Sequence, residues 1–137
     1  MIDWTHIHVL QCLSMHYSID TQSDIQAVVV KAEGIINTLV AEQMVVDTGA
    51  FLKKTGLKRC IFDLVKTDVD PNQSMIEMFT FVRIFEKANI DKSVRMAALY
   101  VSGGEYRTHL EGSAMIEGFK LRHFTDYDEA VNWLCLL

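Results

Sequence analysis

The sequence predicts one α/β domain with a mixed, mainly parallel sheet of four to six strands and helices packed on it. Short apolar segments rich in β-branched residues alternate with segments of helical period, which is typical of parallel sheets with helical crossovers. A turn-rich cluster near the N-terminus separates two strand-like segments, which predicts an antiparallel hairpin at that edge of the sheet. The 137 residues are 50% hydrophobic, enough for one compact core, so residues 1–137 are expected to form a single domain.

The N-terminal third of the chain is strand-like. Residues 6–13 lack helix signals, and residues 1–12 are interpreted as an additional edge strand outside the main pattern. Residues 15–19 and 25–33 are predicted to form the hairpin, with the turn at the polar cluster 20–24.

The rest of the chain alternates between helices and short strands. Apolar residues recur every three or four positions after Asn37, which predicts a helix that ends near Lys54 and is stopped by Gly56. Residues 66–71 are predicted to be a loop, and the capping pair Asp126 and Glu129 starts the last helix. The remaining predicted elements are strands at 60–65, 96–101 and 121–124 and helices at 72–88 and 105–117.

Composition and charge exclude several classes of function. The net charge is −5, from 13 basic and 18 acidic residues, and there is no basic patch, so a nucleic-acid partner is not expected. The chain has no apolar run of about 18 residues for a membrane span, and it has no cationic, apolar secretion signal at its start. Its three cysteines are scattered, which favours reduced thiols in the cytoplasm and a packed core thiol at Cys60.

The predicted helix 72–88 carries more apolar surface than a sheet-covering helix needs. At about 100° per residue its apolar arc spans about 220°, whereas a stripe of roughly 100° is enough to cover a sheet. A neighbouring helix, a second copy of the chain, another protein or an apolar ligand must cover the excess. The candidate partner or ligand surface consists of Met75, Met78, Phe79, Phe81, Ile84 and Phe85.

A second candidate is an anion-binding turn where a strand leads into a helix. Backbone N–H groups at Ser102, Gly103 and Gly104 have the arrangement that holds an anion, and Arg107 follows one turn later. The stretch matches neither a Walker sequence nor a dinucleotide-binding motif, so an ordinary tight turn is the simpler interpretation.

The remaining titratable residues indicate no metal site, no cofactor and no catalytic centre. His6 and His8 have metal-compatible spacing, but no third ligand is fixed by the pattern, His16 included. The carboxylates at 63, 68 and 70 are expected to be solvated or to cap a helix. No nucleophile and base are paired by a motif, so the sequence predicts a protein that is not an enzyme.

Several of these segments resemble the STAS-like proteins, which include the bacterial anti-sigma-factor antagonists. The resemblance covers about residues 24–134 and rests on Phe62-Asp63-Leu64, on the strand 95–100 and on the segment 124–134. Within that last segment the most telling residues are Phe124, Glu129, Ala130, Trp133 and Leu134. The resemblance implies a small cytosolic α/β domain that acts by binding rather than by catalysis.

The sequence departs from the regulatory members of that family at one place. Those members carry an Asp-Ser-Ser-Gly-like stretch with a phosphorylated serine, whereas this chain reads Thr67-Asp68-Val69-Asp70-Pro71-Asn72-Gln73-Ser74. Ser74 lies near a predicted helix start, where the helix dipole would stabilise a phosphate, so it is the candidate phosphorylation site.

The functional prediction is a non-enzymatic binding or regulatory module that contacts another protein, or a second copy of itself as a homodimer, through the helix 72–88. The alternative is a carrier or sensor of an apolar or lipid-like small molecule that uses the same helix. Neither hypothesis requires a cofactor, a nucleic acid or stable membrane insertion.

Overall fold

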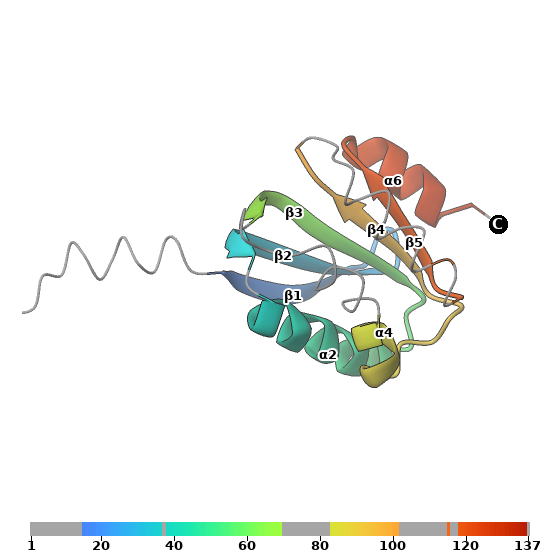
Figure 1. The fold of residues 1–137 in the computed structure, drawn as a ribbon. Coiled ribbons are helices and arrows are strands. Elements are labelled where there is room, and N and C mark those ends of the chain that lie inside the picture. Colours follow the sequence, from blue (N-terminus) through green and yellow to red (C-terminus); the bar gives the residue numbers. More distant parts are fainter. Residues whose placement is uncertain (1–14, 37, 70–82, 102–114, 116–117, 137) are drawn as a thin grey trace, which may run out of the picture.

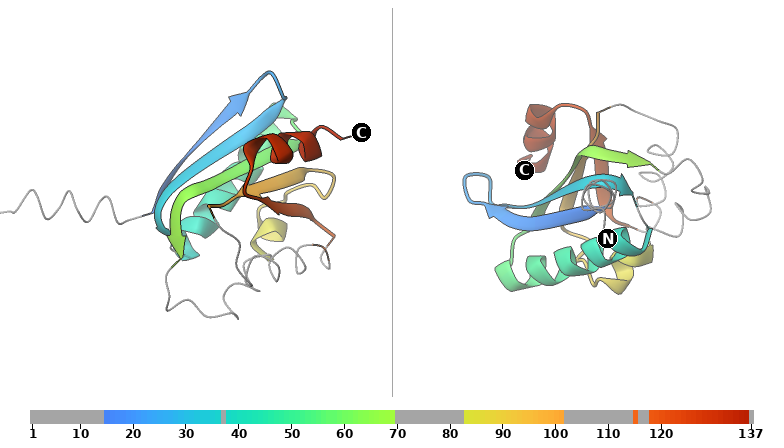
Figure 2. Two further views of the ribbon diagram at one scale, coloured as in Figure 1. Left: turned by 90° about the horizontal axis from the view of Figure 1, so that it is seen from above. Right: turned by 90° about the vertical axis from the view of Figure 1, so that its left-hand side faces the viewer.

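The computed structural model describes residues 15–36, 38–69, 83–101, 115 and 118–136. A five-stranded sheet forms the middle layer, with strand order β1-β2-β3-β4-β5. Helices α2 and α4 cover one face of the sheet, and helix α6 lies on the other face (Figures 1 and 2).

The sheet confirms the predicted mixed topology. Strand β1 is antiparallel to β2, and each later pair is parallel. The β1–β2 hairpin therefore forms the N-terminal edge. The strand bounds are β1 His16–Gln22, β2 Ala27–Ile36, β3 Arg59–Val69, β4 Arg95–Leu99 and β5 Lys120–Phe124.

Three helices are described, α2 Thr38–Thr55, α4 Arg83–Lys87 and α6 Tyr127–Leu134. The Asp126 carboxylate accepts hydrogen bonds from the backbone N–H groups of Asp128 and Glu129, so the predicted cap of the last helix is confirmed. Gly56 follows α2 with a φ of 72°, as expected of a helix stop. Helix α4 is the described end of the predicted helix 72–88. None of the described helices is long and apolar enough to cross a membrane.

Two strands extend beyond their predicted ends. Strand β2 continues through Ile36, and β3 continues through Val69 into the region 66–71 that was predicted to be a loop. The segment Glu33–Ile36 pairs in parallel with Lys66–Val69. In this ladder the backbone N–H and C=O groups of the two segments form hydrogen bonds with each other, whereas sequence propensity alone predicted a loop at 66–71. Similarly, β1 runs through Gln22, and the hairpin turn lies at 23–26 rather than at 20–24.

The larger hydrophobic core lies between the sheet and helices α2 and α4. It is built from alternate residues of β2, β3 and β4, among them Val28, Val30, Phe62 and Met96. Cys60 belongs to this core and is fully buried, which raises the pKa of its thiol. The structure thus confirms Cys60 as a packed core thiol.

Helices α2 and α4 approach each other closely at a glycine. A Cβ atom added at Gly49 would lie 2.4 Å from the backbone oxygen of Ala88, immediately after α4. Helix α2 therefore covers the side of α4 that the sheet does not reach. On the sheet side, the ring of Phe85 packs edge-on against Phe119, with 5.5 Å between the ring centroids.

The smaller core lies on the opposite face, beneath α6. Ala130 and Leu134 of α6 pack there on the residues Ile61, Ala97 and Leu99 of the sheet. Two arginines at the start of β3 and β4 hold the C-terminal end of α6. Arg59 Nε donates to the Leu134 carbonyl oxygen at 3.1 Å, and Arg95 Nη1 donates to the Trp133 carbonyl oxygen at 2.9 Å.

Candidate interaction surface

Helix α6 covers only part of its face of the sheet. It contacts β3, β4 and β5, and it makes no backbone-level contact with the described strands β1 and β2. Residues of β2 alternate between the two faces, so Val30 and Ala32 enter the larger core while Lys31, Glu33 and Ile35 point to the α6 face. Val29 of β2 packs in the smaller core beneath α6, and the Tyr127 hydroxyl of α6 donates to Gln22 Oε1 of β1 at 3.1 Å. Among the described elements, the part of this side that is left uncovered therefore lies around Lys31, Glu33 and Ile35.

A β-bulge in β3 interrupts the alternation of side chains beside this region. Lys31 is opposite Asp63 and Glu33 is opposite Lys66, so β3 contains one residue more than β2 between these pairs. Val65 and Lys66 are both exposed, whereas Leu64 just before them belongs to the larger core. An apolar and a basic side chain that are adjacent in the chain are therefore both exposed at the bulge.

A row of basic and acidic side chains crosses three strands on this face, with the histidine in it charged only when it is protonated. The Glu33 carboxylate lies 3.4 Å from His16 Nε2 on β1 and 3.6 Å from Lys66 Nζ on β3. The three side chains are at least half exposed, so these ion pairs contribute little to stability. Across β1, β2 and β3 the groups follow the order basic, acidic, basic. We call His16, Glu33 and Lys66 the charged row.

Apolar side chains are exposed near the end of β2, in the second half of β3 and just after β4. Ile35 of β2, Val65 of β3 and Val101 just after β4 are 39%, 42% and 70% exposed. The register pairs Asp63 with Leu99, and Val65 and Val101 each follow this pair by two residues, so the two valines lie at a similar position along their strands. We call these three residues the carboxyl-edge patch. Open α/β sheets place their binding sites at this end of the strands.

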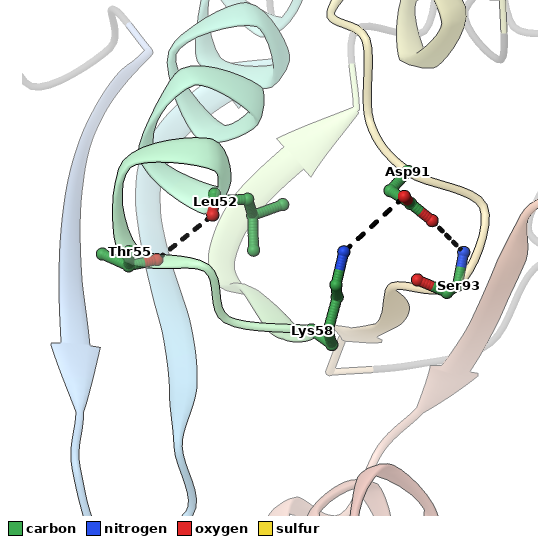
Figure 3. Close-up of polar contacts among 5 residues, drawn as sticks. All are labelled: Leu52, Thr55, Lys58, Asp91 and Ser93. Carbon is green, nitrogen blue, oxygen red and sulfur yellow. Dashed lines mark hydrogen bonds and ion pairs between the residues drawn. The ribbon is translucent and has the colours of Figure 1, made fainter.

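At the opposite, amino-terminal edge of the parallel strands, exposed polar groups link the segments that lead into β3 and β4 (Figure 3). Lys58 Nζ lies 3.6 Å from Asp91 Oδ2, and the Ser93 N–H donates to Asp91 Oδ1 at 2.8 Å. Hydrogen bonds from Ser93, together with the charge of Lys58, lower the pKa of Asp91. These groups complete a turn, which leaves the carboxyl edge as the better candidate for binding.

The acidic residues of β3 have local roles. Asp63 lies within β3 and accepts a hydrogen bond from the Val65 N–H at 3.2 Å, beside the bulge. Asp68 is exposed and is paired with Ile35 in the ladder, so it lies in a strand rather than in a loop. Asp70 lies outside the described residues.

Part of the surface predicted on the helix 72–88 belongs to the core. Ile84 and Phe85 are 7% and 2% exposed and lie among the residues packed under α2, so they do not form an exposed contact surface in the single chain. The physical reason is the close approach of α2, which covers Ile84 and Ala88 on the side that was predicted to need a partner. The other four residues of that surface lie outside the described residues, namely Met75, Met78, Phe79 and Phe81.

The other predicted site residues also fall mostly outside the described part of the chain. Ser74 as a phosphorylation site and the anion turn of Ser102, Gly103, Gly104 and Arg107 stay predictions from the sequence. His16 is described, and it belongs to the charged row.

Sequence reasoning missed the carboxyl-edge patch. Both faces of residues 60–65 were expected to be covered because that segment is mostly apolar, and 66–71 was assigned to a loop. The available signal was the alternation of Lys31, Glu33 and Ile35, which is typical of a strand with one solvated face. The β3 bulge, beside which Val65 is exposed, has no signature in the sequence.

Comparisons with known proteins give matches in structure and none in sequence. No protein-family model matches the chain, and no curated protein sequence matches it. An anti-sigma factor antagonist from Mycobacterium paratuberculosis has a TM-score of 0.56 at 13% identity, with 88% of this chain and 94% of that chain covered. A DUF3478-family protein from Shewanella loihica, described as having a SpoIIAA-like fold, has a TM-score of 0.57 at 20% identity, with 89% and 94% covered.

A third solved structure is similar over its whole length. The anti-sigma factor antagonist SpoIIAA in its unphosphorylated form has a TM-score of 0.53 at 11% identity, with 89% of this chain and 100% of that chain covered. At these identities the similarity establishes the architecture, and it agrees with the mixed five-stranded sheet and its N-terminal hairpin. The chain therefore has the STAS-like fold, the SpoIIAA-like arrangement of strands and helices.

Proposed function

We propose that this chain is a non-enzymatic regulatory module that acts by binding another protein. The observation that carries the proposal is the carboxyl-edge patch of exposed apolar residues Ile35, Val65 and Val101, which lies near the charged row and outside the part of the sheet that α6 covers. Two of the proteins with a similar fold are anti-sigma factor antagonists, which is consistent with a regulatory role.

The chemistry of this surface suits a protein partner. Protein interfaces combine an apolar centre with a polar rim, and ordered charged groups at the rim select the partner and its orientation. Here Val65 and Lys66 are neighbours in the chain, and Lys66 is held by Glu33, so apolar and charged groups adjoin. A partner with an apolar side chain flanked by groups of complementary charge would fit this arrangement.

In this proposal the predicted helix 72–88 also contributes to the contact with the partner, through Met75, Met78, Phe79 and Phe81. The alternative, a carrier of an apolar or lipid-like molecule, uses the same four residues. Native mass spectrometry of the purified protein separates the two hypotheses, because a carrier retains its small molecule while a protein-binding module has the mass of the chain or of its oligomer.

The partner surface is tested with the double variant Val65→Glu/Val101→Glu. Both side chains are exposed, so we expect the domain to keep its circular dichroism spectrum and its melting temperature to within a few degrees. Cross-linking in a lysate of the source organism should give at least one adduct with the wild type that the double variant loses, because two carboxylates oppose an apolar contact.

The matched control is Leu39→Glu. Leu39 is an exposed apolar residue of α2, on the other side of the sheet, so this variant should keep the adduct. An adduct that survives in the double variant, or that is lost equally in Leu39→Glu, would contradict the assignment of the partner surface.

A further inference from the structure

Strand β1 forms an edge of the described sheet and has a regular backbone. Its seven residues pair with β2 without a register shift, from His16 opposite Glu33 to Gln22 opposite Ala27. Within the described residues, β2 is the only neighbour of β1 in the sheet (Figures 1 and 2). A regular edge strand presents backbone N–H and C=O groups to any other strand that approaches it.

The two edges of the sheet differ in their protection. Strand β5, at the other edge, has only five residues and carries the exposed basic side chains Lys120 and Arg122. Short length and basic side chains are the usual means of preventing edge-to-edge pairing. Strand β1 has seven residues and contains no lysine, arginine, proline or bulge. It is therefore the edge that permits strand addition.

We propose that β1 pairs in antiparallel fashion with β1 of a second copy of this chain, with Ser18 on the two-fold axis. This register places His16 opposite the Asp20 of the second copy, and Tyr17 opposite its Ile19. Each pair occurs twice by symmetry. Imidazole–carboxylate and aromatic–β-branched pairs are favourable across antiparallel strands. A shift of the axis to Asp20 would instead oppose two carboxylates, which is unfavourable.

The charged row supports this register. Lys66, Glu33 and His16 already alternate between basic and acidic groups across β3, β2 and β1. The second copy's Asp20 would add an acidic group beside His16, so the alternation would continue across the dimer axis. The register also keeps core-facing side chains of both copies on the same face of the joined sheet, because Tyr17 and Ile19, which would be opposite each other, both pack against the larger core of their own chain. The two sheets would then form one continuous sheet.

The β1 edge and the carboxyl-edge patch share no residue, and the charged row borders both through His16, so the dimer is tested by substitutions at Ser18 and not at the patch. The wild type should show a concentration-dependent mass that approaches twice 15.6 kDa in sedimentation or light scattering at tens of micromolar. Ser18→Glu should weaken the dimer about fivefold or more, since two carboxylates would meet on the axis. Within one chain the new glutamate is opposite Lys31, so the fold should be unaffected.

Mixing two variants tests the register directly. The double variant Ser18→Lys/Lys31→Glu keeps opposite charges facing each other within the hairpin and should also be mainly monomeric alone. An equimolar mixture with Ser18→Glu should regain the dimer because opposite charges then meet on the axis. The control Leu136→Glu changes an exposed residue just after α6, which packs on β3, β4 and β5, and this variant should dimerise like the wild type.

Three outcomes would overturn the inference. A wild type that is monomeric throughout this range would exclude the dimer. A wild type that becomes dimeric only after residues 1–13 are removed would assign the β1 edge to the N-terminal segment of the same chain. A dimer that Phe81→Glu disperses and Ser18→Glu does not would assign self-association to the helix 72–88.

Discussion

Replacing Ile84 by glutamate is expected to destabilise the domain by about 4 kcal/mol or more, because the substitution places an unpaired carboxylate in an apolar site. Ile84 is 7% exposed and is packed in the core shared by the sheet, α2 and α4. Small domains have total stabilities of about 5–15 kcal/mol. Urea denaturation should therefore show a variant that is largely unfolded or that melts at a much lower denaturant concentration.

The neighbouring substitution Arg83→Glu is the matched control, since Arg83 is exposed on the same short helix. It should change the free energy of unfolding by about 0.5 kcal/mol or less. If Ile84→Glu were instead as stable as Arg83→Glu, the Ile84 side chain would have to be exposed. That result would support the interpretation from the sequence, which placed Ile84 on a partner surface.

The pH dependence of the stability of Ile84→Glu shows whether the buried charge causes the destabilisation. Burial raises the pKa of a carboxyl group in the folded state above its value of about 4.3 in the unfolded chain. The folded state then binds more protons, so stability falls as the pH rises from about 4 toward the folded-state pKa. We expect the loss relative to the wild type to be smaller at pH 4 than at pH 8. The uncharged Ile84→Gln should lack this dependence.

The result also bears on how the helix 72–88 was interpreted from the sequence. A wide apolar arc shows that something covers the helix, but the arc is the same whether the cover is α2 or another protein. The distinction depends on where α2 lies, and that is set by contacts such as Gly49 against Ala88, which are 39 residues apart in the chain. No local pattern carries this information.

Sequence periodicity predicted most of the fold because each element has a local signal. The β-branched run at 28–30, the Asp126 cap and Gly56 after α2 are all recognisable without knowledge of their neighbours. The extensions of β2 to Ile36 and of β3 to Val69 were missed because they depend on each other. Each segment is a strand only while the other is present to accept its hydrogen bonds.

The candidate surface was harder to predict for the same reason. Val65 is exposed in the stretch of β3 that follows the bulge and lies beyond the residues packed beneath α6. Both facts concern pairing and packing between distant segments. The composition of residues 60–65 favoured a strand buried on both faces, and for Ile61 and Phe62 that expectation is correct.

Truncating Leu134 to alanine is expected to cost about 2–5 kcal/mol, the usual range for a buried leucine whose site cannot collapse. Leu134 is 1% exposed and packs with Ile61, Ala97 and Leu99 in the smaller core beneath α6. Arg59 and Arg95 bind the carbonyl groups at the end of this helix, so the backbone is held in place and the cavity would persist. Urea titration monitored by circular dichroism measures the loss.

Leu136→Ala is the control, because it removes the same atoms from a side chain that is 61% exposed. The free energy of unfolding should change by about 0.5 kcal/mol or less. Equal losses in the two variants would show that α6 is not docked on the sheet. The comparison also separates two roles for the segment 124–134, which carries the strongest resemblance to STAS-like proteins. A large loss for Leu134 alone means that this resemblance reflects the packing that closes one face of the sheet. The determinants of binding are then to be sought on the part of that face which α6 leaves uncovered.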